Sequence, residues 1–212
     1  MSSSASRKRG LRTLASRVIK RLIDVLLSAL GLLALSPIMV VVAAAELWFH
    51  GWPPLFTQLR SGQNGRVFRL FKFRSMTNER GPDGELLSDE RRLTPFGQWL
   101  RRTSLDELPQ LLNILKGDMS VVGPRPLLPR YHTRYSPLEA FRLLAKPGLT
   151  GWAAVNGRST NTWAERFAYD AYYVDNQSTR LDLRIIARTV AVVFQGGGTR
   201  SEGHVTNPEF GV

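Results

Sequence analysis

The sequence predicts an α+β protein that is mainly helical, with one long apolar helix near the N-terminus followed by a smaller polar domain. Three observations carry this prediction. No charged residue occurs in the 21 positions from Val25 to Ala45, which is long enough for a membrane helix. A polar turn at Ser61–Gly65 separates two strand-like segments and indicates a β-hairpin. Capping residues at Thr94, Ser136 and Thr162 mark the starts of surface helices.

Positive charge is concentrated at the N-terminus of the chain. The whole sequence has a net charge of +12, and seven basic residues precede the first acidic one, Asp24. We therefore predict a basic, disordered arm over residues 1–16 that contacts anionic membrane lipids. A nucleic-acid-binding protein more often carries its basic surface on the folded domain, so we expect no nucleic-acid partner.

The residue types that bind metals restrict the chemistry of the chain. Cysteine is absent, which excludes disulfides and thiolate metal sites. The three histidines, His50, His132 and His204, are scattered, so a zinc site is not expected. Any metal would therefore be a hard, oxygen-bound ion such as Mg²⁺.

The uncharged stretch predicts a helix of roughly 32 Å, enough to cross the core of a bilayer. A straight span is the simplest arrangement. However, Ser36-Pro37 lies just past its middle, where proline kinks a helix. Both flanks are also basic, and the positive-inside rule would keep both in the cytoplasm. Three arrangements stay open on these residues: a straight span, a re-entrant membrane hairpin over residues 17–49 broken at Ser36-Pro37, and a buried helix of a soluble protein.

The predicted hairpin pairs residues 54–59 with residues 66–73. In its second strand, Lys72 and Arg74 share one face because strand side chains repeat every two residues. Such a pair either contacts phosphate or belongs to a solvated face. Both interpretations stay open at this point.

The remaining segments predict short helices joined by turns. The helices are expected from Pro95 to Arg102, from Pro137 to about Lys146, from Thr162 to about Asn176 and from Leu181 to Phe194. The first of them is amphipathic and could lie on a membrane surface. The glycine-rich segment 147–157 is expected to form turns and a short extended stretch rather than a helix.

The stretch from Ser104 to Pro126 contains the candidate chemistry. It predicts a helix to Lys116, stopped by Gly117, with a buried stripe of leucines at positions 108, 111, 112 and 115. Asp106 and Glu107 lie side by side at its start, and Arg125 follows between two prolines. These residue types are typical of a site that binds a metal ion and phosphate groups. Alternatively, Ser104 or Asp106 is only the N-cap and Glu107 is the capping-box partner of Ser104.

Eight short blocks occur in an order that resembles a known enzyme family. They are Lys20-Arg-Leu-Ile-Asp24, Ser36-Pro37, Phe56-Thr-Gln-x-Arg-x-Gly62, Lys72-Phe-Arg-Ser-Met76, Ser104-Leu-Asp-Glu-Leu-Pro-Gln110, Lys116-Gly-Asp-Met-Ser120, Gly123-Pro-Arg-Pro126 and Pro147-Gly-Leu-Thr-Gly151. The chain thereby resembles the bacterial sugar transferase family, the monotopic phosphoglycosyl transferases, from Lys20 to Phe210. The tail from Glu202 to Thr206 is similar to the small, single-domain subgroup.

This resemblance implies a topology and a reaction. The membrane helix would be re-entrant and bent at Ser36-Pro37, with a cytosolic catalytic domain over residues 50–212 at the cytoplasmic face of the bacterial inner membrane. The enzyme would transfer a sugar-1-phosphate from a UDP-sugar to undecaprenyl phosphate and release UMP, with Mg²⁺ required. This is a first membrane step of polysaccharide or glycoprotein biosynthesis, so later glycosyltransferases of the pathway would be further partners.

The resemblance also assigns roles to single residues. Asp106 matches the nucleophile of a covalent aspartyl-phosphosugar intermediate, and Glu107 matches its dyad partner; both would contact the metal. An aspartate is already ionised at pH 7 and needs no base to activate it. The predicted phosphate- and nucleotide-binding residues are Lys72, Arg101, Arg125 and Asp170, with Pro124 and Pro126 stiffening the motif around Arg125.

The donor sugar stays open. The tail subgroup implies an N-acetylated amino sugar such as di-N-acetylbacillosamine, while a hexose such as galactose or glucose would use the same chemistry. A rival from another class is a non-enzymatic, membrane-anchored protein that binds lipid or nucleic acid through its basic arm. Composition allows that rival, but it does not explain the pair Asp106 and Glu107 or the motif around Arg125.

Overall fold

The computed structural model describes residues 14–157, residues 162–194 and Phe210. Its elements in chain order are α1 (Leu14–Phe49), β1 (Leu55–Ser61), η2 (Gln63–Gly65), β2 (Val67–Phe73), α2 (Asp89–Arg92), α3 (Pro95–Thr103), η3 (Leu105–Glu107), α4 (Gln110–Lys116), β3 (Ser120–Val122), η4 (Pro129–Arg134), α5 (Pro137–Ala140), η5 (Phe141–Leu144), β4 (Gly148–Thr150), α6 (Trp152–Asn156), α7 (Trp163–Asn176) and α8 (Thr179–Phe194). The protein is mainly helical with two small two-stranded sheets, as predicted. Nearly all of the predicted arm over residues 1–16 lies outside the described residues.

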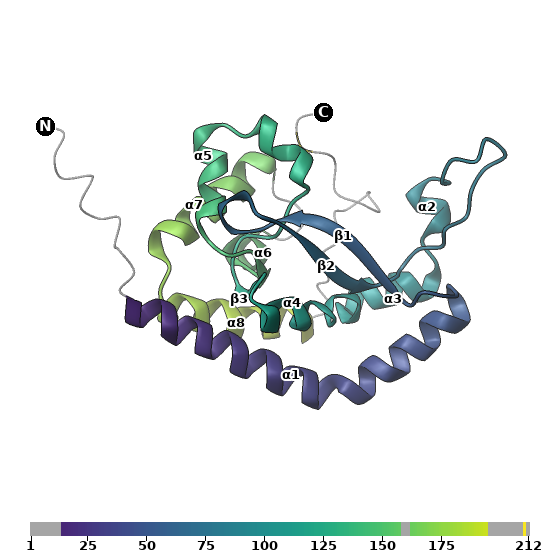
Figure 1. Ribbon diagram of the computed structural model, residues 1–212, viewed down its shortest axis with the longest axis horizontal. Helices are drawn as coiled ribbons and strands as arrows, with labels where there is room; N and C mark the ends of the chain where they lie inside the picture. The colour runs from purple at the N-terminus through teal and green to yellow at the C-terminus, as the bar shows by residue number, and fades with distance from the viewer. Residues whose placement is uncertain (1–13, 158–161, 195–209, 211–212) are drawn as a thin grey trace, which may run out of the picture.

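Helix α1 is a single bowed helix whose two ends turn toward the rest of the molecule (Figure 1). The predicted break at Ser36-Pro37 is therefore wrong in detail, because the helix continues through Pro37. Proline lacks the N–H that would bond the carbonyl of Leu33, four residues earlier. The hydroxyl of Ser36 donates to that carbonyl instead, at 2.9 Å. The Ser-Pro pair thus lets the helix bend without an orphaned carbonyl group.

The outer face of α1 is apolar and exposed. Leu33, Val40 and Val41 are each at least two-thirds exposed. By length and composition the helix could cross a membrane, and only 11% of its most apolar window is buried in the protein. This exposure contradicts the buried helix of a soluble protein, because such a helix would hide these side chains in a core.

The inner face of α1 carries polar side chains that bind the rest of the chain. The Asp24 carboxylate accepts hydrogen bonds from the Ser120 hydroxyl and the Val121 N–H, both at 2.9 Å. Lys20, one turn earlier, donates to the Asp182 carboxylate at 2.8 Å. These side chains are buried, so α1 is fixed to β3 by a hydrogen-bonded carboxylate and to α8 by an ion pair.

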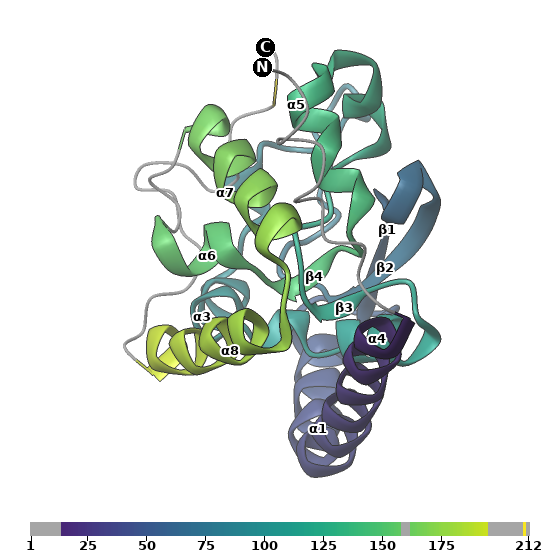
Figure 2. The same ribbon diagram turned by 90° about the vertical axis from the view of Figure 1, so that its left-hand side faces the viewer.

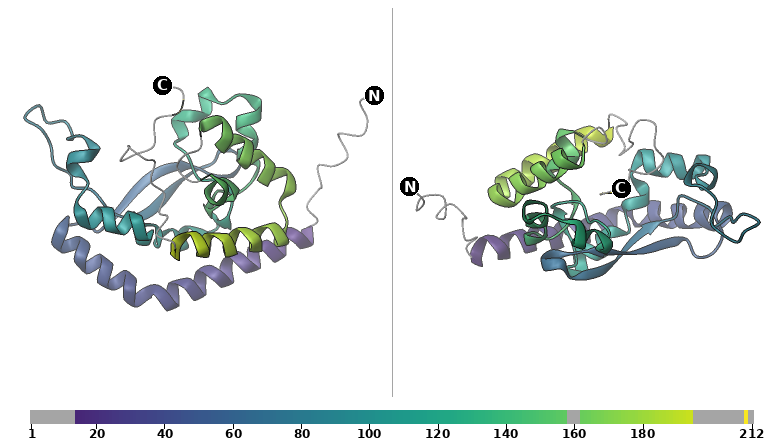
Figure 3. Two further views of the ribbon diagram at one scale, coloured as in Figure 1. Left: turned by 180° about the vertical axis from the view of Figure 1, so that it is seen from behind. Right: turned by 90° about the horizontal axis from the view of Figure 1, so that it is seen from above.

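Three helices lie in a layer beside α1. Helix α4 packs against α1, while α8 and α3 lie to one side, near its N-terminal and C-terminal ends (Figures 1 and 3). At the C-terminal end, the Phe49 and Phe96 rings stack with centroids 4.8 Å apart. Figure 2 shows α6 and α7 on one side of the molecule and the β-hairpin on the other. Strands β3 and β4 lie between these parts.

The predicted hairpin is confirmed. Strands β1 and β2 pair antiparallel with Leu55 opposite Phe73, and the turn places Asn64 in the left-handed region at φ 56°. The buried Asn113 of α4 binds the free edge of β2: its side-chain oxygen accepts from the Phe71 N–H at 3.0 Å, and its amide donates to the Arg69 carbonyl at 2.8 Å. One side chain thereby continues the hydrogen-bond ladder of the sheet.

Two glycines bring distant motifs into backbone contact. Strands β3 and β4 pair in parallel, and just beyond β3 a Cβ added to Gly123 would lie 2.2 Å from the Lys146 carbonyl oxygen. A Cβ added to Gly148 would lie 2.1 Å from the Gly123 nitrogen. Only glycine permits this approach, which connects the segment before Arg125 to β4.

The helix predictions succeed where a cap defines the start. Thr94 accepts from the Gly97 N–H at 2.9 Å, Ser136 and Thr162 form capping boxes, and α7 and α8 follow as expected. The helix expected to Lys146 is wrong: α5 ends at Ala140 and tightens into η5.

A helix inside segment 147–157 was not expected, yet α6 forms there. Its two nearest glycines, Gly151 and Gly157, lie at the ends of α6 rather than within it, so they do not destabilise its interior.

We expect Asn113→Leu to lower the free energy of unfolding by about 2–4 kcal/mol, because it leaves the Phe71 N–H and the Arg69 carbonyl without their side-chain partners at a part-buried sheet edge. Chemical denaturation in detergent measures this difference. The exposed Asn78→Leu is the matched control and should change stability little. Equal stability of the two variants would show that Asn113 does not hold the sheet edge.

Candidate active site

Asp106 and Glu107 lie on a short 3-10 turn, η3, rather than on the first turn of α4. The predicted continuous helix is wrong because Pro109 lacks the N–H that would bond the Leu105 carbonyl. Ser104 ends α3 at φ 58°, where its backbone N–H donates to the carbonyls of Leu100 and Arg101, and its side chain makes no capping hydrogen bond to η3.

The leucine stripe predicted for this segment is confirmed only in part, because Leu111 is buried whereas Leu112 is exposed. The buried face of α4 consists of Gln110, Leu111, Asn113 and Ile114. Leu112 is 40% exposed. Because the helix starts at Gln110 instead of Ser104, a different set of its side chains faces the hairpin and α1.

Asp106 is a buried carboxylate among cations. Its pKa is raised to about 6: burial is the largest cause, the neighbouring Glu107 carboxylate acts in the same direction, and Lys72, Arg125 and Arg101 act in the opposite direction. The group is only 5% exposed. At pH 7 it is mostly ionised, yet it is more basic than an ordinary aspartate, which suits a carboxylate that attacks an electrophile.

Glu107 pairs with Arg125 across the site. The guanidinium donates to the Glu107 carboxylate at 2.6 Å, and this carboxylate raises the pKa of Arg125. The Arg125 side chain is nevertheless about half exposed, at 54%. Its backbone carbonyl accepts from the Arg142 guanidinium at 2.5 Å, which fixes the loop. Arg125 is thus oriented from both ends while part of its guanidinium faces solvent.

Two further cations come from β2 and α3. Burial lowers the pKa values of Lys72 and Arg101, and the Asp106 carboxylate counteracts this effect for both. The Arg101 guanidinium donates to the Ser75 hydroxyl at 2.8 Å. A Cβ at Gly97 would lie 1.9 Å from the Ser75 carbonyl oxygen, so this glycine allows α3 to approach the end of β2. The structure brings these two predicted residues to the same carboxylate.

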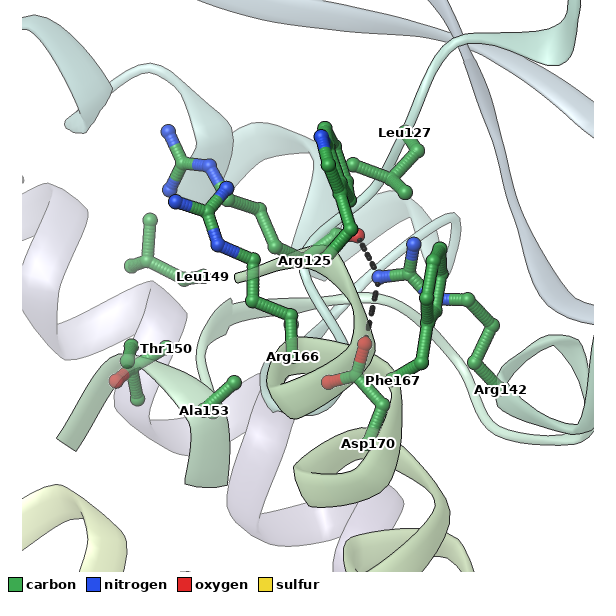
Figure 4. A pocket seen from close by; sticks show the side chains of 13 residues that line it. Arg125, Leu127, Arg142, Leu149, Thr150, Ala153, Arg166, Phe167 and Asp170 are labelled. Carbon is green, nitrogen blue, oxygen red and sulfur yellow. Dashed lines mark hydrogen bonds and ion pairs between the residues drawn. The ribbon is translucent and has the colours of Figure 1, made fainter. Parts of the chain in front are cut away.

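Two other charged residues, Arg74 and Asp170, lie away from the Asp106 carboxylate. Arg74 is buried and donates to the backbone carbonyls of Gly51 and Pro53, so it is neither a phosphate ligand nor part of a solvated face. Asp170 is not beside Asp106; it pairs with Arg142 at 2.9 Å in an adjacent cavity that Arg125 also lines (Figure 4). Burial raises the pKa of Asp170 to about 6.

The donor set of this site fits a magnesium ion. Among the described residues no group of three or more His, Cys, Asp or Glu side chains gathers, so a closed protein cage is absent there. Mg²⁺ commonly uses only one or two carboxylates and completes its shell with water and substrate phosphates. Asp106 and Glu107 supply such a pair, and a cation would relieve the repulsion that raises the pKa of Asp106.

Several supporting residues were not among the predicted site residues, although Ser75 lies in the block from Lys72 to Met76. Ser75 orients Arg101, and Arg142 binds the Arg125 backbone and Asp170. Arg166 lines the cavity beside Arg125. Each of these side chains connects segments that are distant in sequence. The sequence alone shows each of them only as a polar residue near the end of a helix or strand.

Comparisons with known proteins agree on one family. A family model described as bacterial sugar transferase matches residues 15–196. A sugar transferase of Bacillus subtilis, EpsL, is 46% identical over 91% of this chain and 96% of its own length. The undecaprenyl-phosphate galactose phosphotransferase of Salmonella typhimurium is 37% identical over 87% of this chain. A UDP-glucose:undecaprenyl-phosphate glucose-1-phosphate transferase of Xanthomonas campestris is 41% identical over 84% of this chain. The match covers only 42% and 39% of these last two proteins.

We expect Asp106→Asn to be more stable than the wild type at pH 8, by about 3 kcal/mol. The folded chain raises the pKa of this carboxyl from 3.8 to about 6, so keeping it ionised above pH 6 costs stability that a neutral amide does not. As the pH falls from 6 toward 4, the carboxyl is protonated in the folded chain and the difference should shrink.

Urea denaturation in detergent at pH 8 and pH 4.5 measures this effect. Asp175→Asn, an exposed change on α7, is the control and should alter stability at neither pH. A wild type that is as stable as Asp106→Asn at pH 8 would contradict the buried, destabilised carboxylate.

Proposed function

This chain belongs to the bacterial sugar transferase family, and from that premise we propose that it transfers a sugar-1-phosphate from a UDP-sugar to undecaprenyl phosphate, releasing UMP. Relatives named for such transfers to undecaprenyl phosphate support the reaction. The observation that carries the proposal is Asp106, a buried carboxylate influenced by Glu107 and three cations. A membrane-anchored binding protein without enzymatic activity would not require this arrangement.

In the first step, a carboxylate oxygen of Asp106 attacks the sugar-bearing phosphorus of the donor. The new bond joins Asp106 to that phosphorus, and the bond from this phosphorus to the oxygen bridging the two phosphates breaks. UMP leaves with the bridging oxygen, so no proton needs to move. Lys72, Arg101 and Arg125 offset the repulsion between the carboxylate and the diphosphate and stabilise charge on the leaving phosphate.

The proposed metal belongs to the same step. Asp106 and Glu107 would hold Mg²⁺, which when bound supplies charge neutralisation for the diphosphate. Arg125 keeps Glu107 oriented through their contact at 2.6 Å. Two adjacent carboxylates can therefore serve different purposes, with Asp106 forming the covalent bond and Glu107 remaining a ligand.

In the second step, a phosphate oxygen of undecaprenyl phosphate attacks the aspartyl-phosphosugar. The phosphorus–oxygen bond to Asp106 breaks, the carboxylate is regenerated, and the product is the undecaprenyl-diphosphate-sugar. The acceptor phosphate lies at the membrane surface, so the site must lie there too. The exposed apolar middle of α1 and the layer formed by α3, α4 and α8 support this placement.

We further propose that α1 enters the cytoplasmic leaflet and returns to the same face, making the protein monotopic on the inner membrane. The bowed shape of α1 supports this arrangement over a straight span (Figure 1). The buried Asp24 and Glu46, near opposite ends of the apolar stretch, both lie against the domain. A straight span would have to pull either Asp24 away from β3 or His50, the hydrogen-bond partner of Glu46, away from Thr94.

Two donor classes are candidates. An N-acetylated amino sugar is the prediction from the tail of the sequence, which lies largely outside the described residues. A hexose is the second candidate, favoured by relatives named for galactose and glucose. UMP release from UDP-galactose, UDP-glucose and UDP-N-acetylated amino sugars decides between them.

We expect Asp106→Asn to abolish UMP release with every donor in that panel, by at least a thousandfold, because an amide cannot form the covalent intermediate. The assay contains undecaprenyl phosphate and MgCl₂. Asp175→Asn should release UMP at the wild-type rate. Turnover of Asp106→Asn near that of the control would remove Asp106 as the nucleophile.

The topology is tested with single cysteines, which the chain lacks. Cysteines at Lys8 and Asn64, on opposite sides of α1 in the sequence, should both react with a membrane-impermeant maleimide only when the cytoplasmic side is accessible. Labelling of the two positions from opposite sides would establish a straight span instead.

A further inference from the structure

The C-terminal end of α1 carries a carboxylate and a histidine that the proposed reaction does not use. Glu46 directly follows the uncharged stretch, and His50 lies four residues later, just past the end of the helix. Both side chains are fully buried, and a Glu46 oxygen lies 2.7 Å from Nδ1 of His50. The second oxygen, Oε1, has no hydrogen-bond partner among the described residues. A carboxylate is costly to bury at the edge of a membrane helix, so this pair points to a role beyond packing.

The other side of the His50 ring binds the start of α3. Its Nε2 atom lies 2.8 Å from the Thr94 hydroxyl, and that hydroxyl oxygen also accepts from the Gly97 N–H at 2.9 Å. When Nδ1–H donates to Glu46, Nε2 is left as the acceptor for the Thr94 O–H, so each of these hydrogen bonds has a donor and an acceptor. The imidazole thereby joins the end of α1 to the N-terminal cap of α3.

Helix α3 continues this connection to the candidate active site. Gly97 lies against the backbone of Ser75, where an added Cβ would be 1.9 Å from the carbonyl oxygen. Arg101, one turn after Gly97, donates to the Ser75 hydroxyl at 2.8 Å and is one of the cations that act on Asp106. A shift at the start of α3 would therefore move Arg101 relative to the Asp106 carboxylate.

The aromatic contacts between α1 and α3 do not replace this connection. Phe96 stacks on Phe49 with centroids 4.8 Å apart and on Trp99 with centroids 5.8 Å apart. Burial of these rings resists separation of the two helices, but the hydrophobic effect is not directional. Hydrogen bonds depend on angle as well as distance, so the contacts of His50 are suited to fix the orientation of α3.

We propose that Glu46 and His50 are positioning residues for the transferase reaction, which hold Arg101 at the Asp106 carboxylate through the N-terminal cap of α3. Arg101 is then in place only when the end of α1 is seated on the domain. Misplacement of a catalytic group by about 1 Å can lower a rate by about a hundredfold. This inference rests on the proposed function, because it takes Arg101 to act on the reacting groups.

Two substitutions of His50 separate its contact with Thr94 from its contact with Glu46. His50→Gln places an amide oxygen near the position of Nε2 and still accepts from the Thr94 hydroxyl, whereas the side chain of His50→Asn reaches only as far as Nδ1. We expect His50→Asn to lower kcat for UMP release by about tenfold or more, with KM for the UDP-sugar within about threefold of the wild type, because Lys72 and Arg125 still bind the donor. His50→Gln should keep most of the wild-type kcat.

A double substitution tests whether His50 acts through Arg101. Adding His50→Asn to Arg101→Gln should lower kcat little further, because the group that His50 positions is already absent. A further loss as large as that of His50→Asn alone would overturn the proposal. Gln98→Ala, an exposed change on α3, is the matched control and should leave kcat and KM unchanged.

Glu46→Leu is the second variant, and it keeps the test decisive if His50→Asn does not fold. Leucine preserves an apolar buried side chain but removes the acceptor that fixes the His50 ring. We expect Glu46→Leu to lower kcat as His50→Asn does, while chemical denaturation shows a folded protein. A folded Glu46→Leu protein with the wild-type kcat would contradict the role of this pair.

Hydrogen exchange provides a readout that does not depend on turnover. The amides of residues 97–100 should exchange about tenfold faster in His50→Asn than in the wild type and at the wild-type rate in His50→Gln. Unchanged exchange in His50→Asn and Glu46→Leu would overturn the proposal, and so would equal losses of kcat in His50→Asn and His50→Gln. If the wild-type protein releases UMP from no UDP-sugar, the proposed function fails, while faster exchange in His50→Asn alone still supports the connection between α1 and α3.

Discussion

The buried Asp24 carboxylate is the constraint on which the arrangement depends. It lies directly before the apolar stretch of α1, and it accepts hydrogen bonds from Ser120 and Val121 of β3. An unpaired charge there would be costly, so α1 and β3 must stay together. The chain continues from β3 through Gly123 to Arg125. The position of α1 therefore determines the position of Arg125, which pairs with Glu107.

In the candidate site, several short segments bring together one buried carboxylate and cations that only partly offset its burial. Asp106 keeps a destabilised charge because Lys72, Arg101 and Arg125 partly offset its burial. None of these cations neutralises it completely. The folded protein thus stores an unfavourable interaction that a bound metal and a phosphorylated intermediate would relieve, which is a common trade between stability and activity.

Local signals predicted the elements whose ends are set by their own residues. The hairpin turn at Asn64 and the caps at Thr94 and Thr162 are examples, since their hydrogen bonds form within a few residues. The segment around Asp106 was misjudged, because Pro109 divides a pattern that otherwise reads as one helix. The family motifs pointed to residues of the site, but not to the Arg142–Asp170 pair, whose geometry arises only when α7 packs beside the Arg125 loop.

The backbone contact between Gly123 and Gly148 has a consequence for redesign of this scaffold. Neither position has room for even one methyl group, so the two loops cannot be remodelled independently. An engineer who seeks a new donor preference would have to leave this crossing intact and vary the side chains around it. Variation in such a scaffold is then confined to side chains, while the backbone of the two crossing loops keeps its position.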